Sequence, residues 1–147
     1  LREYGVADFQ VESLLRTELG RDKVFVKIPS LAGSPGTLFI GHMQVDDHRL
    51  AEVEASIDAF LQISQFCRPE RISVTQFMKC RKGSFLHDGY LVSPAHGSSD
   101  WGRSARDRIM LATAIGELHR ASKEASDRGV LRRAEEALVE HERGLDV

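Results

Sequence analysis

Apolar residues recur along the first part of the chain with two different spacings. Between Asp8 and Gly20 they stand three and four residues apart, which predicts a short helix that is capped by these two residues. Residues 23–29 alternate between apolar and polar, which predicts a half-buried strand ended by a proline. After a loop rich in Gly, Ser and Pro, residues 37–43 predict a second strand, and we expect the two strands to form a hairpin.

A longer helix is predicted to begin at the pair Asp46-Asp47 and to end before Pro69. Two aspartates at its start suit the free backbone N–H groups and the positive end of the helix dipole. The apolar residues of this helix fall on one stripe, which consists of Leu50, Val53, Ile57, Phe60 and Leu61.

Residues 71–81 alternate again and predict a third strand, and a fourth strand is expected within residues 84–93. The turn between them has two candidate positions. Either Lys82-Gly83 makes the turn and Gly89 marks a bulge, or His87-Asp88-Gly89 makes the turn, since Asp-Gly between apolar runs is a strong hairpin signal. The first alternative is favoured, because the second leaves only a short arm before the turn.

Two helices are predicted in the last third of the chain. Ser104 and Asp107 have the spacing of a capping box at the start of a helix that ends near Gly129. Its apolar stripe is Leu111, Ala114, Ile115, Leu118, Ala121 and Ala125. Residues 130–143 predict a heavily charged helix with a thin apolar seam, which buries little area and is typical of a lid or a partner contact.

The expected order is helix, hairpin, helix, hairpin, helix, helix, which indicates an α+β fold with a mainly antiparallel sheet of about four strands covered by helices. With 147 residues, 41% of them apolar and 29% charged, the chain has the size and composition of one globular domain. We therefore expect a single domain over residues 1–147, with residues 130–147 as a peripheral C-terminal helix.

Charge and cysteine content limit the class of partner. Twenty basic and twenty-two acidic residues argue against a dedicated nucleic-acid binder, because phosphate contacts need a basic surplus. No apolar run is long enough to cross a membrane and no leader opens the sequence, so no membrane partner and a cytoplasmic location are expected. A strand beginning near Cys67 would carry Cys80 too far away for a disulfide, so both thiols are expected to be free.

The most metal-like cluster is Asp46, Asp47 and His48, with His42 nearby. Carboxylates and imidazoles are ligands for a divalent cation. Side chains adjacent in sequence usually diverge, however, and a doubly acidic helix start explains the same residues. The sequence therefore predicts a helix cap here and no metal or other cofactor.

Two short segments contain the residue types of hydrolases. His87 and Asp88 would point to opposite faces of a strand, although in a turn they can meet. One loop holds all three types of the Ser-His-Asp triad, but a triad needs rigid placement from separate parts of a fold; these residues are His96, Ser98, Ser99 and Asp100. No catalytic residue is assigned, and the sequence favours a protein without enzymatic activity.

Lys27 on a strand, followed by a helix with Glu52 and Glu54, resembles the small lobe of protein kinases. This resemblance implies a lysine–glutamate pair that orients nucleotide phosphates. The sequence departs from the kinase pattern because it has no Gly-rich phosphate loop and no Asp-Phe-Gly. A small nucleotide-binding or degenerate kinase-like domain is the alternative function.

The main expectation is an adaptor-like module that binds a protein partner or self-associates. Its candidate surfaces are a sheet edge and the 130–143 helix, and the order of elements resembles the dimerising roadblock and longin modules. A basic hairpin could dock an acidic partner, and tryptophan with arginine is a frequent anchor of protein interfaces. The candidate interaction residues are Lys79, Arg81, Lys82, Trp101, Arg103, Leu131 and Leu138.

Overall fold

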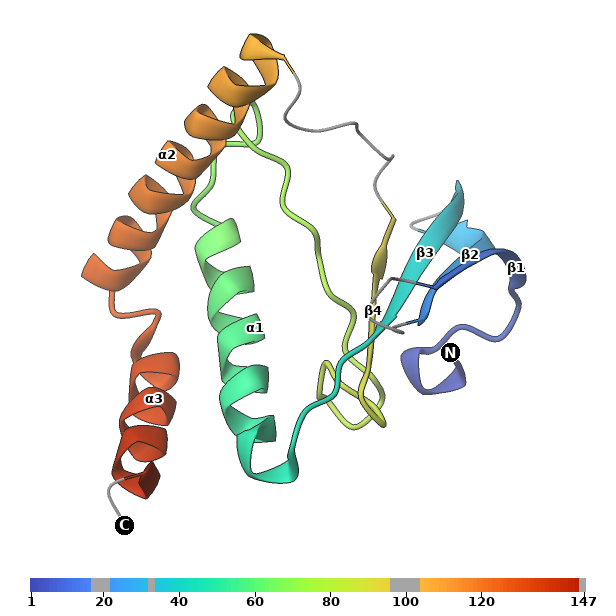
Figure 1. The fold of residues 1–147 in the computed structure, drawn as a ribbon, viewed down its shortest axis with the longest axis horizontal. Helices are drawn as coiled ribbons and strands as arrows, with labels where there is room; N and C mark the ends of the chain where they lie inside the picture. Colours follow the sequence, from blue (N-terminus) through green and yellow to red (C-terminus); the bar gives the residue numbers. More distant parts are fainter. Residues whose placement is uncertain (17–21, 32–33, 96–103, 146–147) are drawn as a thin grey trace. The chain divides into compact units, whose positions relative to one another are not determined.

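The computed structural model describes residues 1–16, 22–31, 34–95 and 104–145, and the chain forms two compact units (Figure 1). The sheet unit comprises Leu1–His48 and Thr75–His96, and the helical unit comprises Arg49–Val74 and Gly97–Val147. The predicted fold class, α+β with an antiparallel four-stranded sheet, is confirmed. A single domain with a peripheral C-terminal helix stays a prediction.

The sheet is a meander in which β1 (Gln10–Arg16), β2 (Asp22–Leu31), β3 (Ser34–His42) and β4 (Tyr90–Pro94) pair antiparallel in that order. The predicted hairpin of the strands at 23–29 and 37–43 is confirmed as β2 and β3. β2 continues past Pro29 to Leu31, and its register with β3 is irregular there, as expected where a proline interrupts the ladder.

The helix predicted between Asp8 and Gly20 is wrong as far as the structure describes it. Gln10–Arg16 is strand β1, which pairs with β2, and residues 17–21 lie outside the described part. A register shift between Val11 and Ser13 explains the misleading pattern, since an extra residue breaks the alternation of a strand. The pairing partner that β2 provides decides the conformation of this segment.

One face of the sheet carries the hydrophobic core of the sheet unit. In the register, Val26 stands opposite Leu38, and Ile40 opposite Val92, so alternate residues of three strands point to the same side. The core combines them with side chains from outside the sheet: Tyr4, Val26, Ile28, Leu38, Cys80 and Val92. The Tyr4 hydroxyl lies 2.6 Å from the carbonyl of Phe85 and 2.7 Å from that of Tyr90.

The segment that precedes β4 differs from the prediction. Residues 72–80 form no assigned strand, although the N–H of Met78 donates to the carbonyl of Val92. His87 and Tyr90 exchange both backbone hydrogen bonds around Asp88 and Gly89, whose φ angles are 50° and 80°. Positive φ at both positions identifies a two-residue hairpin turn, so Gly89 belongs to a turn and the predicted bulge is wrong.

The tight turn at Gly83 is present as well. Its φ is 85°, and its N–H donates to the carbonyl of Cys80 over 2.9 Å. Both proposed turn positions are therefore turns, with a short arm between them.

The helical unit contains α1 (Leu50–Ser64), α2 (Ala105–Asp127) and α3 (Arg132–Leu145), and α1 contacts both of the others. A 3-10 turn, Asp47–Arg49, precedes α1. The residue at the cap position of α1 is Arg49 and no side chain bonds there, so the predicted aspartate cap is wrong. The predicted Ser104–Asp107 capping box is confirmed, with N–H···O distances of 3.1 and 3.2 Å.

Candidate functional site

The acidic and imidazole residues that resemble metal ligands are not gathered into a site. Asp46, Asp47 and His48 are exposed, and among the described residues no three His, Cys, Asp or Glu side chains lie close enough to hold a metal ion. His87 Nε2 lies 3.5 Å from Asp88 Oδ2 within the two-residue turn, with the Asp88 side chain 83% exposed. The predicted hydrolase-like loop, residues 96–100, lies outside the described residues.

Lys27 forms an ion pair with a residue of the neighbouring strand. Its ammonium lies 3.2 Å from the carboxylate of Glu12 on β1, and both side chains are largely exposed. Glu52 accepts a hydrogen bond from Arg49 over 3.5 Å in the first turn of α1. Glu54 is half-buried on the same helix.

The candidate interaction residues are dispersed in the fold. Lys79 places its ammonium 4.9 Å from the ring centroid of Phe85. Arg81 and Lys82 are exposed in the Gly83 turn, where the N–H of Arg81 donates to the carbonyl of Glu3. Leu131 is half-buried before α3. Trp101 and Arg103, and the side chain of Leu138, lie outside what the structure describes, so these three residues stay predictions.

A buried carboxylate joins the segment after α1 to α2. Glu117, whose side chain is 6% exposed, accepts two hydrogen bonds from the Arg120 guanidinium and one from the backbone N–H of Arg68. Arg120 also donates to Glu124 and to the carbonyl of Phe66.

The hydrogen bonds from Arg120, and then that from Arg68, hold the pKa of Glu117 at about 2. Each member of this network is satisfied by another, which is the arrangement of a structural cross-link.

The two cysteines are free, as predicted. Burial, and then the Glu117 carboxylate, raise the pKa of the Cys67 thiol. A hydrogen bond with Ser84, whose hydroxyl lies 3.1 Å away, lowers the pKa of Cys80. Cys80 is buried in the core of the sheet unit, where its role is packing.

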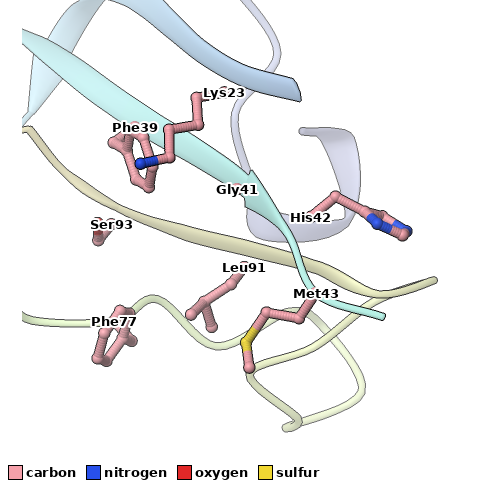
Figure 2. Close-up of a pocket in the computed structure, with 8 residues that line it drawn as sticks. All are labelled: Lys23, Phe39, Gly41, His42, Met43, Phe77, Leu91 and Ser93. Atoms are coloured by element: carbon pink, nitrogen blue, oxygen red, sulfur yellow. The ribbon is translucent and has the colours of Figure 1, made fainter. Parts of the chain in front are cut away.

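The sheet face opposite the core is hollowed into a pocket of about 240 Å³, which we call the sheet-face pocket (Figure 2). Its walls come from β2, β3, β4 and the segment beside β4: Lys23, Phe39, Gly41, Met43, Phe77 and Leu91. Ser93, 4% exposed, also lines it, and Figure 2 shows this side chain between the rings of Phe39 and Phe77. A second hollow of about 380 Å³ shares Phe39, Phe77 and Ser93 and extends to Phe25.

Large apolar side chains are exposed on the first half of α2. We call Ile109, Met110, Leu111 and Ile115 the α2 patch; they are 69%, 52%, 46% and 44% exposed. On the second half of the same helix, Ala121 and Ala125 are fully buried. Leu111 and Ile115 belong to the apolar stripe of the sequence, and the structure leaves both of them exposed.

The two helices differ in length. α1 has 15 residues and is about 22 Å long, whereas α2 has 23 residues and is about 34 Å long. The bonds from Glu117 and Arg120 join the chain just after α1 to the middle of α2, and the α2 patch lies on the turns before them. A run of three apolar residues, Ile109-Met110-Leu111, was the sequence signal for the patch.

None of the helices in the described part of the chain combines the length and apolarity of a membrane span. Comparisons with protein-family models, with curated proteins and with solved structures found no match.

Proposed function

We propose that the chain is a non-enzymatic, adaptor-like module that binds a protein partner through the α2 patch. The single observation that carries this proposal is the exposure of four large apolar side chains between residues 109 and 115. Exposed apolar clusters of this kind are typical of protein-interaction sites. Leu111 and Ile115 are four residues apart and therefore lie on the same face of the helix, which suits binding in an apolar groove of the partner.

The rim of the patch indicates the chemistry of the partner. Arg106 and Arg108 are exposed on the turn before it. Methionine and arginine are both enriched at protein interfaces, and arginine at a rim favours acidic groups opposite. The expected partner is therefore a protein with an apolar groove bordered by aspartate or glutamate side chains.

Site-specific photocrosslinking in cells of the source organism tests the proposal. A benzophenone side chain at Ile115 is expected to give one dominant crosslinked protein, which disappears when Ile109 and Met110 are changed to glutamate. The matched control places the benzophenone at exposed His119, one turn further along α2. Equal crosslinking from both positions, or none from Ile115, contradicts the proposal, and a crosslink to a second copy identifies self-association.

The sheet edge and the 130–143 helix stay predictions as further contact surfaces. Among the described strands β1 pairs with β2 only, so its outer edge is open for strand addition. Phe9 and Val11, which are 49% and 57% exposed, lie at the start of this edge.

The nucleotide-binding alternative rests on the order of elements, a lysine-bearing strand followed by a helix with two glutamates. It expects ATP with Mg²⁺ to raise the melting temperature and Lys27→Ala to abolish the rise. Lys23→Ala, a second lysine on β2, is the matched control. An unchanged melting temperature would remove this alternative.

A further inference from the structure

The floor of the sheet-face pocket is open because residue 41 is a glycine. In the register Gly41 stands between Lys23 on β2 and Leu91 on β4. A Cβ atom at this position would lie 3.2 Å from the ring of Phe39, which is closer than ordinary contact. Any larger residue would therefore fill the hollow or displace the ring.

The walls of the pocket suit a flat apolar group. Phe39 packs against Phe25 with 5.3 Å between the ring centroids, and Phe77 faces the pocket from the segment beside β4 (Figure 2). Aromatic rings prefer offset or edge-to-face partners, so phenylalanines in the wall of a pocket favour an aromatic ligand. The volume of about 240 Å³ is below the range of about 300–1,000 Å³ that is usual for drug-sized ligands, which indicates a compound of one or two rings.

Lys23 supplies a positive charge at the pocket. Its ammonium lies 5.9 Å from the centroid of Phe39, and it forms no ion pair with any residue that the structure describes. Lys27 lies four residues further along β2 on the same face, and its ammonium is paired with the Glu12 carboxylate at 3.2 Å. Figure 2 shows the His42 imidazole directed away from the two phenylalanines, and it stacks edge-on with Tyr90 at 4.9 Å.

From this arrangement we infer that the sheet-face pocket binds a small aromatic carboxylate, with its ring against Phe39 and Phe77 and its carboxylate at Lys23. A single ammonium matches one negative charge, whereas phosphate groups usually require several donors. The Ser93 hydroxyl offers a hydrogen bond inside the pocket. This site belongs to the sheet unit and is independent of the α2 patch, so either proposal can fail alone.

The test uses indole-3-acetate and its neutral amide, indole-3-acetamide, as probes of the 147-residue chain in calorimetric or ligand-observed NMR titrations. The acetate is expected to bind about fivefold more tightly than the amide, which is the effect of one partly exposed ion pair. Lys23→Gln should remove this preference, and Lys27→Gln, the matched control, should preserve it. Gly41→Leu should abolish the binding of both probes.

The inference is overturned by no binding of the acetate, by a preference that survives in Lys23→Gln, or by undiminished binding in Gly41→Leu. Thermal unfolding checks that each variant folds. If Gly41→Leu does not fold, Phe77→Ala replaces it, with at least a tenfold loss of affinity expected from the missing aromatic wall. Tighter binding of phenyl phosphate than of the acetate also contradicts the assignment to a carboxylate.

Discussion

The sheet unit and the helical unit are stabilised in different ways. The sheet unit buries large apolar side chains almost completely, with Val26 and Val92 at 1% exposure and Leu38 at 0%. In the helical unit, α1 has no buried residue, and the buried residues of α2 are two alanines and Glu117. Among the described side chains of the helical unit, contacts of small residues and an ionic network therefore take the place of large apolar burial. We expect the stability of this unit to respond to pH and that of the sheet unit not to.

The largest expected effect is that of Leu38→Ala in the sheet unit. Removing a fully buried leucine side chain leaves a cavity and should lower the free energy of unfolding by about 3–5 kcal/mol. Urea unfolding measures this loss. Val11→Ala, at a position that is 57% exposed, should change the stability by less than about 0.5 kcal/mol. A similar, small loss in both variants would show that this core does not stabilise the sheet unit.

Glu117→Gln should have the next largest effect, and it should be confined to the helical unit. The pKa of Glu117 is about 2 in the folded chain and about 4.5 when unperturbed. The ionised Glu117 carboxylate therefore contributes its full stabilisation of the helical unit above about pH 4.5, and this contribution is lost as the pH falls toward 2. Helicity measured by circular dichroism during unfolding should show this loss in the parent chain, and Glu117→Gln should already be less stable at pH 7.

In Glu117→Gln, the loss of stability at low pH that comes from protonation of this carboxylate should be absent. Glu140→Gln, an exposed carboxylate on α3, is the control and should leave the acid profile unchanged. Identical acid profiles of Glu117→Gln and the parent would contradict an ionic basis for the stability of the helical unit.

Tyr4→Phe should destabilise the sheet unit by about 1–2 kcal/mol, because the carbonyls of Phe85 and Tyr90 lose the hydroxyl that donates to them. Chemical denaturation at two pH values measures the loss in the free energy of unfolding, which should be the same at both. Tyr90→Phe serves as the control, since this side chain is 48% exposed. Equal effects of the two variants would mean that the Tyr4 hydroxyl does not tie the N-terminus to the sheet unit.

Ser104→Ala should have the smallest effect, a loss of about 1 kcal/mol in the helical unit from the missing N-cap. Thr113→Ala removes an exposed hydroxyl that bonds within α2, and it should change the stability by less than about 0.5 kcal/mol. Helicity at 222 nm during urea unfolding distinguishes the two. A larger loss for Thr113→Ala would contradict the importance of the capping box.

Several elements could be predicted because their signals are local. The capping box at Ser104 and Asp107 depends on two residues three positions apart, and the strands at 23–29 and 37–43 depend on simple alternation. The candidate sites were harder to predict. The sheet-face pocket combines residues from four segments of the chain, and no spacing in the sequence indicates that Lys23, Gly41 and Phe77 share one hollow.

The sequence by itself determined the antiparallel α+β class and the positions of three helices, because hydrophobic period and capping act over a few residues. The tertiary structure decided that residues 10–16 are a strand, since their hydrogen-bond partners come from β2. It also decided which half of α2 is buried, since Glu117 and Arg120 bind backbone groups of the distant segment that follows α1. Pairing and coverage are contacts between distant residues, which a local pattern does not encode.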